Sequence, residues 1–235
     1  MEVLNIKNIF FSYNEKLLLK NISLSLEEGE FLSIVGSSGC GKSTIIKLIA
    51  GIEKANSGTI ECKSTGYMPQ RDLLLPWRNI LDNILLPMEI NKKNLEEGKK
   101  KALEYLKKLK LDEYKNAFPS ELSGGMKQRI SFLRTLFTEG EILLLDEPFS
   151  ALDMITKEQL QKWLLEILKE FKKSIIFITH DINEAIFLSD RILVCKNSPL
   201  DSFEEFKITP NIKNSPEESM ELKNKILKII KGEER

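Results

Sequence analysis

The sequence predicts an α/β protein with a parallel-sheet core, an N-terminal antiparallel β part and an α-helical insertion. Two short apolar runs, residues 142–145 and 175–178, are each bounded by polar residues, as buried parallel strands are. An amphipathic helix is expected between them, over residues 157–171. Strand–helix–strand alternation of this kind implies a parallel sheet with right-handed crossovers. A further buried strand, 31–35, runs into a glycine-rich loop.

The remaining segments complete this architecture. Residues 3–11 are rich in Ile, Val and Phe, and residues 21–26 alternate between apolar and polar, so both are expected to be strands. Asn94 followed by Glu97 is typical of a helix start, and so is Ser215 before a proline and two glutamates. We therefore expect one domain over 1–235, with an α/β core at 1–75 and 138–210, a helical subdomain at 76–137 and a C-terminal helix at 211–235.

Composition and charge exclude some classes of protein. The 235 residues carry 35 Lys and Arg against 35 Asp and Glu, whereas a dedicated nucleic-acid binder normally has a basic excess. No apolar run is long enough to span a bilayer, and residues 1–7 carry charges where a signal peptide would be apolar. The widely spaced cysteines 40, 62 and 195 form no metal-ligand pattern and favour a reducing cytoplasm. Any membrane role is expected to depend on a partner.

A phosphate-binding loop is predicted at residues 36–43, which match G-x-x-x-x-G-K-[ST]. Glycines let backbone N–H groups turn toward phosphates, and the helix that follows directs its positive end at them. Lys42 can reach the β- and γ-phosphates, and Ser43 can coordinate Mg²⁺. An ordinary flexible turn is disfavoured, because a strand precedes the loop and a helix follows it. The expected nucleotide contacts are Gly36, Ser37, Ser38, Gly39, Cys40, Gly41, Lys42, Ser43 and Thr44.

Two acidic residues follow the apolar run 142–145. Asp146 ends this predicted strand, and in ATPases of this type such an aspartate holds Mg²⁺. Glu147 comes directly after it and can polarise a water molecule for attack on the γ-phosphate. Acids are also common where strands reach the surface, but the phosphate loop upstream makes that alternative weaker.

A second glycine-rich helix start occurs at residues 122–129, Leu-Ser-Gly-Gly-Met-Lys-Gln-Arg. Free N–H groups, a helix dipole and a serine hydroxyl make it another anion-binding terminus, although Ser-Gly-Gly also starts plain capped helices. Here the sequence resembles the ABC ATPase family, whose signature LSGGQ it matches with Met126 in place of Gln. Methionine at this position is a familiar variant in some importer subfamilies.

The resemblance extends along almost the whole chain in family order. Gln70 matches the glutamine that in the family reaches toward Mg²⁺ and the attacking water, and residues 150–153 match the loop that crosses the dimer interface. His180, the only histidine, matches the residue that contacts the γ-phosphate and follows a buried strand, where parallel sheets present ligand contacts. Tyr13 matches the aromatic that stacks on adenine, and a core role is the alternative for it.

The resemblance implies an ATPase that uses ATP and Mg²⁺. Two copies would pair head to tail, with ATP held by loop 36–43 of one and by Ser123, Gly124 and Gly125 of the other. The other implied partners are polytopic membrane permease subunits and an extracytoplasmic solute-binding protein, with no nucleic acid, and the expected location is the cytoplasmic face of the membrane. The implied catalytic residues are Glu147, His180, Gln70 and Lys42, and the implied metal ligands are Ser43, Gln70 and Asp146.

The segment after Gln70 suggests an importer group. Leu-Leu-Pro-Trp at 74–77, followed by Asp82 and Asn83, looks like the group that serves nitrate, aliphatic sulfonates, taurine and pyrimidine thiamin precursors. The alternative is that Trp77 simply packs the helical subdomain. A rival class is a soluble ABC ATPase without a membrane subunit, although the single cassette and short insertion disfavour the translation and DNA-maintenance types. A nucleotide kinase or other P-loop enzyme is disfavoured by the second anion-binding motif.

Overall fold

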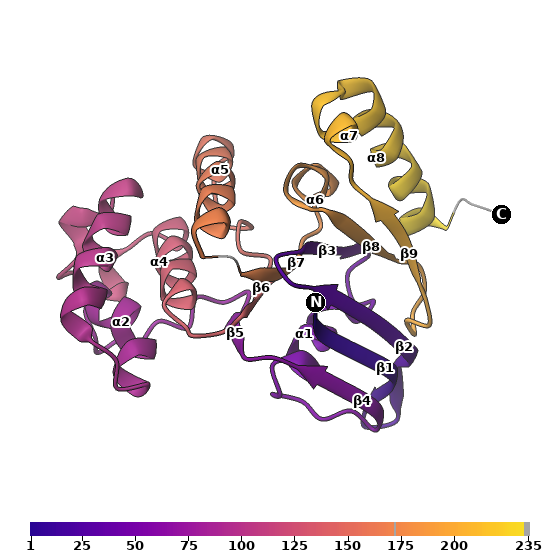
Figure 1. Cartoon of the computed structure of the whole chain (residues 1–235), viewed down its shortest axis with the longest axis horizontal. Helices are drawn as coiled ribbons and strands as arrows, with labels where there is room; N and C mark the ends of the chain where they lie inside the picture. The colour runs from indigo at the N-terminus through magenta and orange to yellow at the C-terminus, as the bar shows by residue number, and fades with distance from the viewer. Residues whose placement is uncertain (172, 233–235) are drawn as a thin grey trace. The chain divides into compact units, whose positions relative to one another are not determined.

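The computed structural model describes residues 1–171 and 173–232, apart from the side chains of residues 168–170. The chain divides into two compact units, one formed by Met1–Lys63 with Leu168–Arg235 and the other by Ser64–Ile167 (Figure 1). The domain boundaries expected from the sequence stay a prediction.

The first unit begins with a three-stranded antiparallel sheet. It pairs β1 (Glu2–Tyr13) with β2 (Lys16–Glu27) on one side and with β4 (Ser57–Cys62) on the other. Apolar side chains of β1 and β2 alternate with exposed polar ones, and this alternation buries one face of the sheet. The predicted antiparallel β part is therefore confirmed, while β4 was not foreseen.

The same unit contains the phosphate loop at the end of a parallel arrangement. The central strand β3 (Phe31–Gly36) pairs in parallel with β7 (Ser174–Ile178) and β8 (Arg191–Cys195), and every residue of β3 is buried. At the edge, β9 (Phe203–Lys207) runs antiparallel to β8. A strand that is buried throughout and parallel to both neighbours accounts for a segment that is apolar except at the buried Ser33 and at Gly36.

Helices cover this sheet. They are α1 (Lys42–Ile49), α6 (Ile182–Leu188), α7 (Pro210–Asn214) and α8 (Pro216–Lys231). Apolar residues of α6 and α8 share one core cluster with Val35 of β3 and Val194 of β8. The single C-terminal helix expected over 211–235 is instead two helices, because Ser215 is extended and caps α8 through a bond from the Glu218 N–H. The last three residues of that prediction lie outside the described residues.

The second unit combines two strands with helices. Strands β5 (Thr65–Met68) and β6 (Ile142–Asp146) pair in parallel. The helices are α2 (Ile80–Ile90), α3 (Leu95–Lys108), α4 (Gly124–Leu136) and α5 (Met154–Phe171), and two short 3₁₀ turns, Asp112–Tyr114 and Pro119–Glu121, connect α3 to α4. Asn79, Asn94 and Ser123 cap α2, α3 and α4 through their side-chain oxygens, so the helix start predicted at Asn94 is confirmed.

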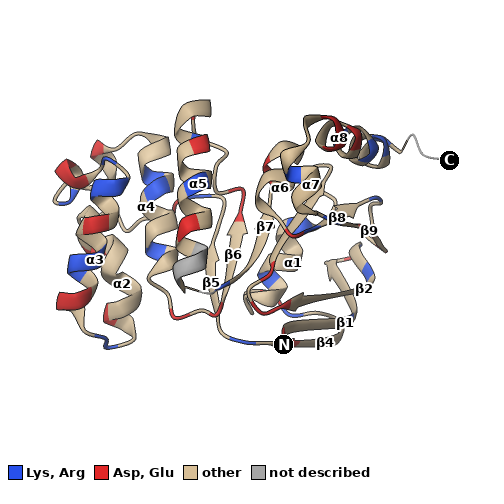
Figure 2. Ribbon diagram, turned by 45° about the horizontal axis from the view of Figure 1, so that its top comes forward, with Lys and Arg blue, Asp and Glu red and all other residues tan. Residues whose placement is uncertain are grey.

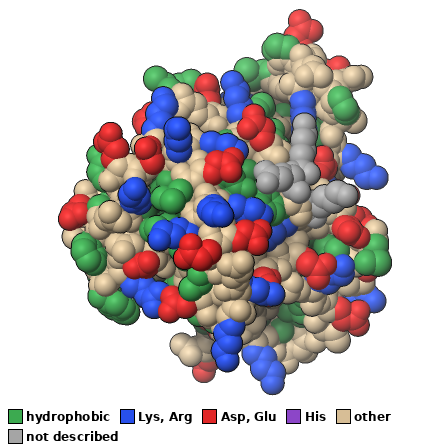
Figure 3. Space-filling view, turned by 60° about the vertical axis from the view of Figure 1, so that its left-hand side comes forward, with side chains coloured by type: hydrophobic (Ala, Val, Ile, Leu, Met, Phe, Trp, Pro, Cys, Tyr) green, Lys and Arg blue, Asp and Glu red, His purple; other side chains and the backbone are tan. Residues whose placement is uncertain are grey.

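Surface charge is mixed in sign. In α3, Lys101 and Lys108 pair with glutamates one turn earlier, and α8 carries acids in its first turn and lysines in its last (Figure 2). Acidic and basic side chains are also interspersed on the face drawn in Figure 3. This arrangement keeps the faces solvated and suits the helix dipoles. Of the helices that the structure describes, none has the length and apolar content needed to cross a membrane.

Candidate functional site

Lys42 is held inside the predicted phosphate loop. Its Nζ donates hydrogen bonds to the carbonyl oxygens of Gly36 and Ser37, both at 2.8 Å. The side chain is buried although it carries a charge, and these two bonds satisfy two of its three donors. The loop therefore encloses an ammonium group between the end of β3 and the start of α1, where a phosphate would meet it.

Gly41 forms the entrance to α1. Its φ is 107°, a conformation that favours glycine, and a Cβ there would lie 2.9 Å from Cδ2 of Leu19, which would have to shift. Because glycine supplies no side chain, no side-chain acceptor caps the start of α1. The first N–H groups of a helix that lack such a cap are suited to an anion.

Tyr13 lies next to this loop in the same unit. Its hydroxyl donates to Oε1 of Glu53 at 2.9 Å and also forms a hydrogen bond with Thr44 at the end of the loop. Burial, followed by the bond and the charge of Glu53, raises the pKa of Tyr13, which keeps the phenol protonated. The ring is 38% exposed and meets Phe11 edge-on at 4.8 Å. The sequence expectation of an aromatic beside the nucleotide loop is thus compatible with its position.

His180 lies at the same edge of the sheet as the loop. It directly follows the buried residue Thr179, whose N–H donates to the Ile34 carbonyl of β3 at 3.4 Å. Because β3 and β7 are parallel neighbours, their carboxyl ends meet there, and the exposed imidazole follows the end of β7. Loop 36–43, Tyr13 and His180 are accordingly brought together within the first unit.

The second unit contains the two predicted acidic residues. Asp146 ends β6 and is 4% exposed. Glu147 follows with a φ of 48°, a left-handed conformation that costs energy for a residue with a Cβ and occurs preferentially at functional sites. Its Oε2 accepts a hydrogen bond from Nε2 of Gln70 at 3.1 Å. The structure therefore brings together Gln70 and Glu147, which lie far apart in the sequence.

Gln128 fixes the backbone at Glu147 from the side of α4. Its Nε2 donates to the Glu147 carbonyl at 3.1 Å, and its Oε1 accepts from the N–H of Ala151 at 3.0 Å. It is 4% exposed. Gln128 lies within the signature segment 122–129, but the sequence gives no sign of its partners, so this role was not predicted.

Tyr67 of β5 is a neighbour of Asp146. Burial, and secondarily the charge of Asp146, raises the pKa of Tyr67 to about 12. The phenol of β5 is therefore a neutral neighbour of Asp146 at all physiological pH values.

The signature segment begins α4. Ser123 accepts a hydrogen bond from the Met126 N–H at 3.3 Å, which makes the serine a helix cap as well as a potential anion ligand. Gly124 is exposed, and nothing lies within 4 Å of where its Cβ would be. Arg129 braces the segment, because its Nε donates to the Gly125 carbonyl at 3.4 Å and its Nη1 to the Leu109 carbonyl at 3.0 Å.

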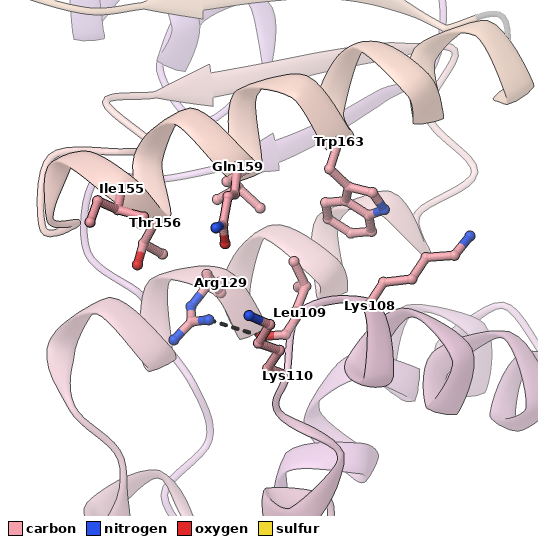
Figure 4. A pocket seen from close by; sticks show the side chains of 9 residues that line it. Lys108, Leu109, Lys110, Arg129, Ile155, Thr156, Gln159 and Trp163 are labelled. Atoms are coloured by element: carbon pink, nitrogen blue, oxygen red, sulfur yellow. Dashed lines mark hydrogen bonds between the residues drawn. The ribbon is translucent and has the colours of Figure 1, made fainter.

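A pocket of about 300 Å³ lies next to Arg129 (Figure 4). The indole of Trp163 projects into it from α5, and Arg129 borders it from α4. Trp163 is 8% exposed and packs edge-on against Tyr105 and Phe132. The remaining lining residues are Lys108, Leu109, Lys110, Ile155, Thr156, Gln159 and Leu160.

The segment from Gln70 to Trp77 is held by two polar side chains. Arg134 of α4 donates to the carbonyls of Asp72 and Leu73, at 2.7 and 2.8 Å. The fully buried Asn83 accepts from the Leu75 N–H at 2.7 Å and donates to three carbonyl oxygens of residues 75–79. Trp77 itself is 71% exposed, so the alternative that it packs the helical core is wrong, and Trp163 takes that role instead.

The predicted metal ligands suit magnesium by their chemistry. A carboxylate, an amide and a hydroxyl are hard oxygen donors of the kind Mg²⁺ binds, usually together with phosphate oxygens and waters. Within the described part of the chain, no group of three or more His, Cys, Asp or Glu residues is arranged to hold a metal alone. Ser43 belongs to the first unit, and Gln70 and Asp146 to the second.

The fold and these residues define a class. A buried parallel strand leads into a glycine-rich loop that encloses a lysine, a helix follows, and a second buried strand ends in Asp-Glu. This combination defines an ATPase of the P-loop class.

Comparison with known proteins identifies the family within that class. The family described as "ABC transporter" matches residues 19–150. The formylaminopyrimidine import ATP-binding protein ThiZ of Halalkalibacterium halodurans is 40% identical, over 97% of this chain and 94% of that protein. The aliphatic sulfonates import ATP-binding protein SsuB of Bacillus cereus is 39% identical, over 89% and 87%. The chain therefore belongs to the ABC transporter family, as an ATP-binding subunit close to ThiZ and SsuB.

Solved structures agree with this assignment. The ATP-binding cassette MJ0796, in a dimeric post-hydrolysis state bound to ADP and Pi, superposes with a TM-score of 0.78 at 32% identity. The match covers 88% of this chain and 99% of that one. A second dimeric structure of the same cassette gives 0.79 at 31% identity. The ABC ATPase fold expected from the sequence is confirmed.

Proposed function

We propose that this chain is the ATP-hydrolysing subunit of an importer for a small solute of the nitrate, sulfonate, taurine or pyrimidine-precursor type. The observation that carries the proposal is the 3.1 Å hydrogen bond from Gln70 to Glu147. This bond connects the Glu147 carboxylate, which is suited to hydrolysis, with the segment that runs from Gln70 to the exposed Trp77. The solute class is supported by the formylaminopyrimidine and sulfonate importers to which the chain is similar.

The hydrolytic roles follow from side-chain chemistry. Glu147 accepts the proton of the attacking water, and Gln70 orients the carboxylate that does so. Lys42, already enclosed by loop 36–43, turns its ammonium toward the β- and γ-phosphates, and His180 contacts the γ-phosphate. Tyr13 provides an aromatic face for adenine. When bound, Mg²⁺ supplies electrostatic stabilisation of the phosphate oxygens, and Ser43, Gln70 and Asp146 would hold it.

Two copies are required to complete each site. The signature residues Ser123, Gly124 and Gly125 form a second anion-binding helix start that one phosphate loop does not use. In a head-to-tail dimer they would close over the γ-phosphate held by loop 36–43 of the other copy. Support comes from the similar cassette whose solved structures are dimeric.

Coupling to transport takes place at the surface around Trp77. Trp77 is 71% exposed and lies in a segment that a proline stiffens. Arg134 and Asn83 donate hydrogen bonds to backbone carbonyl oxygens of this segment. Such a rigid aromatic anchor suits a helix of a polytopic permease. The subunit would then work at the cytoplasmic face of the membrane, with an extracytoplasmic solute-binding protein delivering the solute.

Affinity purification of the tagged full chain from its native membranes tests the proposal. A polytopic membrane protein should copurify in stoichiometric amount, and the complex should hydrolyse ATP faster when the solute and its binding protein are added. A chain that hydrolyses ATP but copurifies only with soluble proteins would instead be a soluble ABC ATPase.

A further inference from the structure

Two buried thiols meet beneath the phosphate loop. Cys40 belongs to the loop, and Cys195 is the last residue of β8, where it pairs in register with Gly36. Each residue is only 1% exposed. The two side chains share a hydrogen bond, so the sulfurs are direct neighbours although their residues are far apart in the sequence.

Gly36 leaves the space in which the thiols meet. A Cβ at this position would lie 2.7 Å from Cβ of Cys195 and 3.2 Å from Sγ of Cys40. No side chain larger than hydrogen fits there without moving one of the cysteines. The contact between the thiols is therefore fixed by the backbone of β3 and β8 rather than by mobile surface side chains.

The surroundings make the two sulfurs chemically unequal. Nζ of Lys42 donates to Sγ of Cys40 at 3.8 Å. The hydrogen bond from Cys195 and, against the effect of burial, the charge of Lys42 lower the pKa of Cys40 to about 6. The bond with Cys40 and burial raise the pKa of Cys195. Of the two sulfurs, Cys40 is thus the one whose thiolate Lys42 favours, and Cys195 is its thiol neighbour, which is the arrangement of an attacking and a resolving cysteine.

We propose that Cys40 and Cys195 are a redox modification site whose disulfide closes the phosphate loop to nucleotide. The effect on nucleotide binding rests on the proposed function, whereas formation of the disulfide does not.

A peroxide is the oxidant, because it is small enough to reach buried sulfur. The Cys40 thiolate attacks one peroxide oxygen, the O–O bond breaks, and sulfenic acid and hydroxide form. The Cys195 sulfur then attacks the sulfenic sulfur, the S–O bond of the sulfenic acid breaks, and the departing hydroxyl takes the proton of the Cys195 thiol and leaves as water.

The balance is complete with hydrogen peroxide. Two thiols lose two electrons and two protons and become one disulfide, and one hydrogen peroxide becomes two waters. An S–S bond of about 2.05 Å draws the sulfurs closer than any hydrogen-bonded contact. It also removes the thiolate that Lys42 faces and ties the loop to β8. The backbone amides of loop 36–43 can then no longer adjust their positions around the phosphates of a nucleotide.

Peptide mapping of the full chain after treatment with hydrogen peroxide tests the disulfide. Digestion without reductant should yield the Cys40 and Cys195 peptides linked to each other within one chain, and dithiothreitol should separate them. Cys62→Ser is the matched control and should give the same linked peptides, because Cys62 is exposed on β4 and takes no part in the contact between Cys40 and Cys195. Cys195→Ala should give none. Unlinked peptides in the wild type, or linkage through Cys62, would overturn the assignment.

The effect on nucleotide is measured on the same samples. The affinity of the linked protein for ATP should fall by at least about tenfold, equal to about 1.4 kcal/mol, and recover with dithiothreitol. An unchanged affinity in protein shown to be linked would overturn the closure of the loop. A reduced protein that does not bind ATP would contradict the proposed function instead, while the peptide map would still decide the disulfide.

Discussion

Gln70 and Glu147 are joined by a hydrogen bond of 3.1 Å between Nε2 and Oε2. Glu147 is also held through its carbonyl oxygen by Gln128, in a left-handed conformation with φ 48°. Glu147 is therefore held at two points, its carboxylate by the segment after β5 and its backbone by the signature helix α4. A strained acid positioned in this way is suited to hold one water in one orientation.

The first prediction concerns that carboxylate. Glu147→Gln should slow ATP turnover by roughly 10²- to 10⁴-fold, the usual range for a general base, and leave ATP binding intact. Steady-state phosphate release and equilibrium titration with ATP measure the two quantities. Glu141→Gln, an exposed acid just before β6, is the matched control and should turn over at the wild-type rate. Near-normal turnover in Glu147→Gln would remove the residue from catalysis.

Arg134 should hold the segment after Gln70 in place. Arg134→Gln removes the charged donor to the carbonyls of Asp72 and Leu73, and such bonds contribute about 1.5–3 kcal/mol. The free energy of unfolding should fall by that order, and trypsin should cleave after Arg71 faster than in the wild type. Urea titration and timed digestion measure both, with Lys127→Gln on the same helix as the control. Equal cleavage rates in both variants would show that the hydrogen bonds from Arg134 are not needed to hold the segment.

The two tryptophans should separate assembly from folding. Trp77→Ala should leave the melting temperature of the free subunit almost unchanged, because the side chain is 71% exposed. It should weaken binding to the permease by about 2 kcal/mol or more, the threshold for an interface hot spot. Trp163→Ala, which removes a core indole, should cost about 3–5 kcal/mol of folding stability. A large fall in melting temperature for Trp77→Ala without an assembly defect would contradict the docking role.

Arg191 should stabilise the first unit through a nearly buried ion pair. Its Nε donates to Glu30 at 2.6 Å and its Nη2 to the Ser25 carbonyl at 2.6 Å. Arg191→Met leaves the Glu30 carboxylate without its charged partner and should cost about 3–5 kcal/mol. The exposed pair of Lys101 with Glu97 is the contrast, and Lys101→Met should change stability by less than about 1 kcal/mol. Chemical denaturation of both variants decides, and equal effects would show that burial does not matter here.

Local patterns in the sequence predicted much of the fold. Loop 36–43 lies between a strand and a helix as expected, and the starts at Asn94 and Ser215 are capped by their own side chains. Such features depend on neighbouring residues, so the sequence contains them. Helix α5 begins three residues earlier than its apolar spacing predicted. The Asp153 carboxylate accepts from the Thr156 N–H there, and the first two helical residues are exposed apolar side chains that mask the pattern.

Contacts between distant segments were not predictable. Nothing in their spacing places Cys195 against Cys40, because that contact depends on the register between β3 and β8. The hydrogen bonds from Arg134 and Asn83 to backbone carbonyls have no sequence pattern either, because every residue supplies a carbonyl oxygen. The exposure of Trp77 likewise depended on which indole, 77 or 163, filled the helical core.

The central claim is that two copies close head to tail around ATP. The mass of the Glu147→Gln variant in solution tests this claim most directly. Light scattering should give the mass of one 27.0 kDa chain without nucleotide and twice that mass with ATP and Mg²⁺. Adding Ser123→Arg, which blocks the signature start of α4, should abolish the dimer while the phosphate loop still binds ATP. A Glu147→Gln variant that binds ATP and stays at the mass of one chain would contradict the account.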